Sequence, residues 1–151
     1  MSRTTEFRCM GVLLMALSAC AQPDAADRAA RETSVTALAD TRWTVEQLGA
    51  ESGSALATLT LHFTGSDRVS GHDGCNSFGG AVSIKGPAIN ISSNLAVTMM
   101  ACPEAVDIRA RNYRAALLQA TQFRISGNRL ELRTASGTLV ASLSRSGGDP
   151  G

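Results

Sequence analysis

In several segments between residues 41 and 145, hydrophobic side chains recur at every second position, and this period of two limits the chain to a fold built mainly from strands. The clearest example is Leu59, Leu61 and Phe63, which are separated by polar residues, as expected of a strand with one face in the core. Further strands are predicted over residues 42–48, 78–84, 88–91, 123–125, 130–132 and 139–143. The short glycine-containing segments between these runs are typical of turns.

One segment, from Pro103 to Gln122, has apolar residues at spacings of three and four, which predicts an amphipathic helix. Its expected inner face carries Val106, Ala110, Tyr113, Leu117 and Ala120, and its expected outer face carries Arg109, Arg111 and Arg114. Strands followed by one helix and more strands predict an α+β domain. We expect a curved, mainly antiparallel sheet with the amphipathic helix packed on its concave face.

Length and composition narrow the classes of protein further. The 151 residues suit a single domain, and 44% hydrophobic residues exclude wholesale disorder. The 14 Lys and Arg residues are balanced by 13 Asp and Glu residues and are spread along the chain, and aromatic residues make up only 4%. This pattern gives no basic surface and few stacking platforms, so no nucleic-acid partner is expected.

The first 20 residues resemble an export signal. Arg3 and Arg8 precede an apolar run over residues 9–17, which is too short to span a bilayer as a helix. The sequence Leu-Ser-Ala-Cys at 17–20 resembles the lipobox of bacterial lipoproteins, in which Cys20 becomes the lipid-modified N-terminus. Ala21 in place of Asp after this cysteine favours the outer membrane. An ordinary cleavage site or a buried cysteine is the alternative interpretation.

These patterns divide the chain into four parts. Residues 1–19 are expected to be the lipoprotein signal peptide, and residues 20–40 a flexible tether, because they contain few large aliphatic residues. Residues 41–145 form the expected folded domain, and residues 146–151 a disordered tail. The domain would be held at the cell envelope by its lipid anchor and would face the periplasm.

Two glycine-rich or methionine-containing segments, 69–80 and 95–103, stand out in the domain. The first contains Gly71, Gly74, Cys75, Asn76, Phe78 and Gly80, and the second contains Leu95, Thr98, Met100, Ala101 and Cys102. Together with Trp43 and the pattern over 123–132, they resemble the META domain, the family of HslJ-like heat-shock proteins. The glycines of the first segment are typical of a tight turn that leads into a strand. A phosphate-binding loop is disfavoured, because no Lys-Ser/Thr pair and no helix follows.

The resemblance has several implications. The family fold is similar to the half-barrel of secretin-pilot lipoproteins, which implies an apolar groove between sheet and helix, a partner protein or apolar ligand, and a role in envelope stress tolerance. The alternative is a purely structural or interaction module whose groove is filled by Leu117, Leu118, Phe63 and Phe78. Ala110 departs from the family pattern, which usually has a glutamate there.

Export would bring the cysteines into an oxidising compartment. Removal of Cys9 with the signal peptide and acylation of Cys20 leave Cys75 and Cys102, and an even pair favours a disulfide over two reduced thiols.

Enzyme and metal functions find little support in the sequence. A Cys-His enzyme built on Cys75, His72 and Asp73 is the weakest alternative, and we expect the protein to have no enzymatic activity. Two histidines and at most two thiols lack the close spacing of metal ligands, so neither a metal nor a cofactor is expected.

Overall fold

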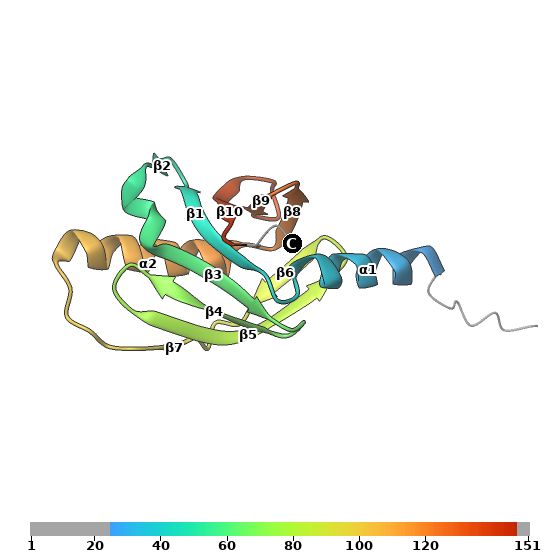
Figure 1. Cartoon of the computed structure of the whole chain (residues 1–151), viewed down its shortest axis with the longest axis horizontal. Coiled ribbons are helices and arrows are strands. Elements are labelled where there is room, and N and C mark those ends of the chain that lie inside the picture. Colours follow the sequence, from blue (N-terminus) through green and yellow to red (C-terminus); the bar gives the residue numbers. More distant parts are fainter. Residues whose placement is uncertain (1–24, 148–151) are drawn as a thin grey trace, which may run out of the picture.

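The computed structural model describes residues 25–147, so the predicted signal peptide, Cys20 and the last four residues lie outside the described part. In chain order the elements are α1 (Ala25–Leu38), β1 (Arg42–Leu48), β2 (Glu51–Ser52), the 3-10 helix η1 (Ser54–Thr58), β3 (Leu59–Thr64), β4 (Arg68–Asp73), β5 (Ser77–Lys85), β6 (Ala88–Ile91), β7 (Ala96–Val97), α2 (Glu104–Gln119), β8 (Gln122–Ser126), β9 (Arg129–Arg133) and β10 (Leu139–Arg145). The α+β class predicted from the sequence is confirmed (Figure 1).

The sheet is a closed barrel, and the prediction of a half-barrel is wrong. Antiparallel pairs follow the order β10-β9-β8-β6-β5-β4-β3-β1, and β1 pairs back with β10, for example at Val45 and Leu143. Eight strands therefore close on themselves, while the two-residue strands β2 and β7 add to β1 and β5. The closure was not predicted, because hydrophobic alternation indicates which face of a strand is buried but does not indicate which strand, about a hundred residues away, pairs with it.

Side chains fill the interior of the barrel. Leu59, Leu61 and Phe63 are fully buried, as the alternation predicted, and Trp43 from β1 is fully buried beside them in one continuous core. The indole nitrogen of Trp43 donates a hydrogen bond to Thr41 Oγ1 at 2.7 Å, so its polar atom is satisfied. An eight-stranded barrel is about the size whose interior side chains can fill, and the buried side chains of the described residues form one continuous core here.

Helix α2 packs against several strands of the barrel. It contacts β4, β6 and β10, which lie on different sides of the closed sheet, and it buries Ala110, Tyr113, Ala116 and Leu117. Leu118 is 42% exposed, which corrects the expectation that it fills a groove. Adjacent helical residues are about 100° apart around the axis, so a helix that buries Leu117 turns Leu118 away.

Residues 25–38, expected to belong to a flexible tether, form helix α1 in the structure. The helix projects from one end of the barrel (Figure 1). Its last residue, Leu38, is fully buried in the core, and the Leu38 carbonyl accepts a hydrogen bond from Thr41 Oγ1. The tether prediction rested on the small number of large aliphatic residues in this segment, but Leu38 packs into the core formed by residues of the barrel.

Candidate functional site

The turn between β4 and β5 is organised by one buried carboxylate. Asp73 is fully buried, and its Oδ1 accepts hydrogen bonds from the backbone N–H groups of Cys75 at 3.0 Å and Asn76 at 2.6 Å. Gly74, which lies between Asp73 and Cys75, has a φ of 90°, a conformation that favours glycine. The turn predicted from the sequence is therefore present, and Asp73 holds it in place.

Asn76 joins this turn to the segment before α2. Its Oδ1 accepts hydrogen bonds from Thr98 Oγ1 at 3.0 Å and from the backbone N–H of Met100 at 2.7 Å. Thr98 Oγ1 also accepts from the N–H of Ser77 at 3.1 Å, and the Thr98 N–H donates to the Ser77 carbonyl at 3.0 Å. The two segments identified in the sequence are thus in direct contact, and their polar residues bond to each other.

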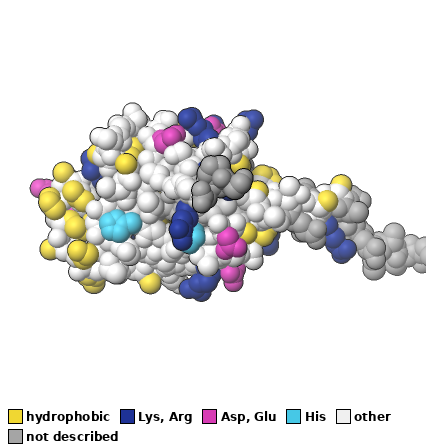
Figure 2. All heavy atoms as spheres, viewed as in Figure 1, with side chains coloured by type: hydrophobic (Ala, Val, Ile, Leu, Met, Phe, Trp, Pro, Cys, Tyr) yellow, Lys and Arg dark blue, Asp and Glu magenta, His cyan; other side chains and the backbone are white. Residues whose placement is uncertain are grey.

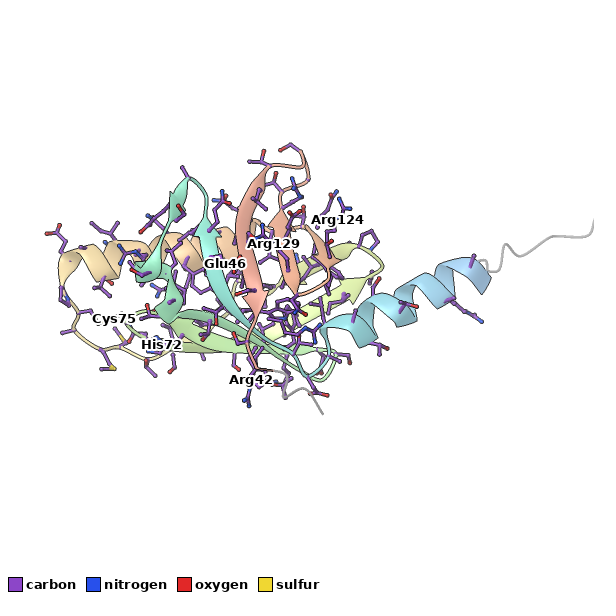
Figure 3. All side chains as sticks on the ribbon, turned by 45° about the horizontal axis from the view of Figure 1, so that its top comes forward. Arg42, Glu46, His72, Cys75, Arg124 and Arg129 are labelled. Carbon is purple, nitrogen blue, oxygen red and sulfur yellow. A yellow bond between two sulfur atoms is a disulfide. The ribbon has the colours of Figure 1, made fainter. Side chains whose placement is uncertain are left out.

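A disulfide adds a covalent link between the same segments. The sulfur atoms of Cys75 and Cys102 are bonded, with their Cα atoms 6.0 Å apart, as the cysteine analysis expected (Figure 3). His72 Nδ1 accepts a hydrogen bond from the N–H of Gly74 at 3.1 Å. Because the Cys75 sulfur is bonded to Cys102, it offers no thiolate, and the Cys-His alternative loses its nucleophile.

The remaining motif residues serve close packing. A Cβ atom at Gly71 would lie 2.1 Å from the Thr60 carbonyl oxygen and 2.6 Å from Phe78 Cζ, and one at Gly80 would lie 2.6 Å from Leu95 Cδ2. At Gly71 the clash is with backbone, so that position has no room for a side chain, whereas at Gly80 the Leu95 side chain would have to shift. Phe78 itself is buried. These residues explain how the turn and strand fit together.

Two polar contacts of the site were not predicted from the sequence, those of Arg114 and of the Tyr113 hydroxyl. Arg114, which was expected to point outward, pairs with the buried Asp73 and is 22% exposed. Tyr113 is fully buried and packs edge-on against Phe78, and its hydroxyl donates to the Thr60 carbonyl at 3.1 Å. Burial, and to a smaller extent the Asp73 carboxylate, raises the pKa of Tyr113 well above its ordinary value. An aspartate in the glycine-rich segment and several arginines on the predicted helix were the available signal for the ion pair.

Above this rigid base, the loop from β7 to α2 exposes apolar side chains. Met99 is 98% exposed and Met100 is 66% exposed, the two highest values among large hydrophobic residues in the described part of the chain. A groove of about 520 Å³ runs beside them. It is lined by Asn76, Leu95, Val97, Thr98, Met99, Met100, Ala101, Asp107 and Arg114. Figure 2 shows hydrophobic side chains gathered at the end of the molecule where this loop meets the start of α2.

A different cleft lies between α2 and the ends of β1 and β10. It measures about 470 Å³, and its lining mixes apolar residues such as Leu48 and Val140 with polar ones such as Glu51 and Gln119. It is open and mixed in character, and the core beneath it is packed. This mixed cleft lies where the family resemblance implied an apolar groove between sheet and helix.

Two further features of residues 25–147 are relevant to function. No three His, Cys, Asp or Glu side chains gather there in an arrangement that could hold a metal ion. Neither helix in that range has the length and apolar character needed to cross a bilayer.

Comparisons with solved structures show the same fold. An NMR structure of a protein from Burkholderia xenovorans is 23% identical, with a TM-score of 0.59 over 89% of this chain and 99% of that one. A second NMR structure is 19% identical, with a TM-score of 0.58 over 74% of this chain and 93% of that one. The crystal structure of a DUF4847 family protein from Bacteroides vulgatus is 12% identical, with a TM-score of 0.57 over 74% of this chain and 96% of that one.

Sequence comparison identifies the family. A search of curated proteins found no significant match. A sequence model of the META domain matches residues 36–147, which extends the expected domain by a few residues at each end. The match includes both segments that meet at the Asp73 turn. On this evidence the chain belongs to the META domain family.

Proposed function

We propose that this protein is an envelope lipoprotein whose META domain is a non-enzymatic module that binds a partner protein through the loop carrying Met99 and Met100. The observation that carries the proposal is this pair of exposed methionines on a backbone fixed by a disulfide and by Asn76. Exposed apolar patches commonly mark interaction sites, and methionine adapts its shape to different partners. The filled barrel disfavours an apolar ligand in the interior.

Attachment through Cys20 is supported by the lipobox-like sequence at 17–20 and by the internal disulfide, which fits an oxidising compartment. Ala21 favours the outer membrane as the destination. Helix α1 would then act as a spacer of about 20 Å at 1.5 Å per residue. In Figure 1, α1 and the β7–α2 loop lie at opposite ends of the molecule, so an anchored domain would present the methionines toward the periplasm.

The biological role follows the family resemblance. A lipid-anchored binding module facing the periplasm could hold a partner at the membrane, and we propose that this supports envelope stress tolerance. A purely structural module is the second candidate, because the closed and filled core is what that alternative expects.

Fractionation tests the anchor. Cys20→Ala should leave the protein unprocessed or release it from the membrane fraction, because Cys20 is the only cysteine that stands in a lipobox-like sequence. Normal processing and outer-membrane fractionation of the variant would contradict the lipoprotein proposal.

Photo-crosslinking in cells tests the binding surface. A photo-reactive phenylalanine derivative at Met99 should give a discrete crosslinked species, whereas the same group at the exposed Arg124 on β8, far from Cys75 in Figure 3, should not. Crosslinks at neither position would favour the purely structural module. Equal crosslinks at both positions would indicate nonspecific proximity.

A further inference from the structure

Barrel closure leaves few unpaired strand edges, and one of them lies at the methionine loop. Within residues 25–147, β7 pairs only with β5, through Phe78 with Val97 and Gly79 with Ala96. The Thr98 N–H donates to the Ser77 carbonyl at 3.0 Å. The next pair along the ladder, Phe78 and Val97, is therefore a non-hydrogen-bonded pair. Alternate residues of a strand direct their backbone groups to opposite edges, so the N–H and C=O of Val97 point away from β5.

This unpaired edge borders the groove of about 520 Å³. Leu95 and Val97 line the groove and pack partly against the core, and Asp107 and Arg114 of α2 also line it. The groove therefore combines a strand edge, apolar side chains beside it and residues of a helix. A groove of this kind accepts an extended chain, whose backbone pairs with the edge while alternate side chains contact apolar pockets.

The charges at the groove are already neutralised. Asp107 pairs with Arg111 one helical turn away, and Arg114 pairs with Asp73. The groove thus presents no net charge, which complements an uncharged segment and disfavours an acidic or basic peptide.

We infer that the partner contributes an extended, uncharged segment that adds to β7 as a further strand, with its apolar side chains against Leu95, Val97 and Met99. The inference rests on the proposed function and specifies how that surface binds. The Val97 N–H and C=O supply the backbone hydrogen bonds, and the side chains supply the apolar contact.

Two proline variants test the edge without any ligand. Val97→Pro removes an N–H that points outward, and proline is tolerated on edge strands, so the melting temperature should stay within about 2 °C of wild type. Ala96→Pro removes an N–H that faces β5 and should lower the melting temperature by about 4 °C or more. Equal effects of the two variants would overturn the assignment of the edge.

A library of random peptides displayed on phage then tests the mode of binding with the full chain. Selected peptides should be uncharged and rich in strand-forming residues, and they should slow hydrogen exchange at Val97. Val97→Pro should weaken their binding about tenfold or more. Val97→Thr, which keeps the N–H and the side-chain shape, should bind within about threefold of wild type.

Several outcomes would overturn the inference. These are a failure to select any peptide, selection of charged or helical peptides, or equal binding by Val97→Pro and wild type. A wild-type dimer with a protected Val97 amide would assign the edge to a second copy of the chain and would also overturn it. Crosslinking from Met99 that persists in Val97→Pro would leave the proposed function standing and reject only binding by strand addition.

Discussion

The phenol of Tyr113 should keep its proton at pH values where an ordinary tyrosine ionises, and this should make the fold sensitive to alkaline pH. Burial, with the Asp73 carboxylate as a second cause, raises the pKa of Tyr113 in the folded protein. In the unfolded chain the phenol ionises near pH 10. As the pH rises above that value, only the unfolded state loses the proton, so stability present below about pH 10 is progressively lost.

The size of the effect follows from the linkage relation. Above pH 10 the free energy of unfolding should fall by about 1.4 kcal/mol for each pH unit because of this one group. Tyr113→Phe removes the group and its hydrogen bond to Thr60, which should cost about 1 kcal/mol at neutral pH. The wild-type and variant stability curves should therefore meet between about pH 10.5 and 11.

The chain is well suited to the measurement. Tyr113 is its only tyrosine, so phenolate absorbance reports this residue alone, and the only tryptophan, the buried Trp43, reports unfolding by fluorescence in urea. The variant also controls for every other group that titrates at alkaline pH. A native absorbance titration centred near pH 10, or parallel stability curves for the two proteins, would refute the reasoning.

Three further predictions concern the turn and its links. Asp73→Ala should destabilise the fold by about 3–5 kcal/mol in urea unfolding, because it leaves two backbone N–H groups and an arginine without their acceptor. Gly71→Ala should lower the melting temperature strongly, because its Cβ would clash with the Thr60 carbonyl oxygen. Gly79→Ala should change the melting temperature little, because its Cβ would lie 3.6 Å from the Val69 carbonyl oxygen, an ordinary contact distance. Alkylation of denatured, unreduced protein should label neither Cys75 nor Cys102, and full labelling of both would contradict the bridge in the cell.

The sequence predicted local features of the fold well and long-range ones poorly. The alternation of Leu59, Leu61 and Phe63 and the helical spacing around Tyr113 are local signals, and both gave the correct element and the correct buried face. Closure of the barrel depends on the pairing of β1 with β10, which are far apart in the sequence. The spacing of hydrophobic residues within a strand does not predict that pairing. Helix α1 was missed for a related reason, since Leu38 is buried by residues distant in the chain.

In the candidate site, too, local features were predicted from the sequence and long-range contacts were not. The residues of the turn and of the methionine segment were identified by composition and resemblance, and the structure brings Asn76, Thr98 and Met100 together. The pairing of Asp73 with Arg114 depends on how α2 lies across the barrel. Helical periodicity predicted that Arg114 points outward, whereas in the structure it pairs with the buried Asp73 carboxylate.

Rigidity of the backbone beneath the methionines bears on how the surface would bind. Binding costs free energy for each loop and side chain that becomes ordered, so a loop already held in place loses less on association. Here the disulfide, the Asn76 hydrogen bonds and the Thr98 contacts with Ser77 fix the backbone on which Met99 and Met100 are carried. The methionine side chains remain flexible and can adapt to differently shaped apolar groups. A fixed strand edge beside adaptable side chains favours partners that share an extended backbone and differ in sequence.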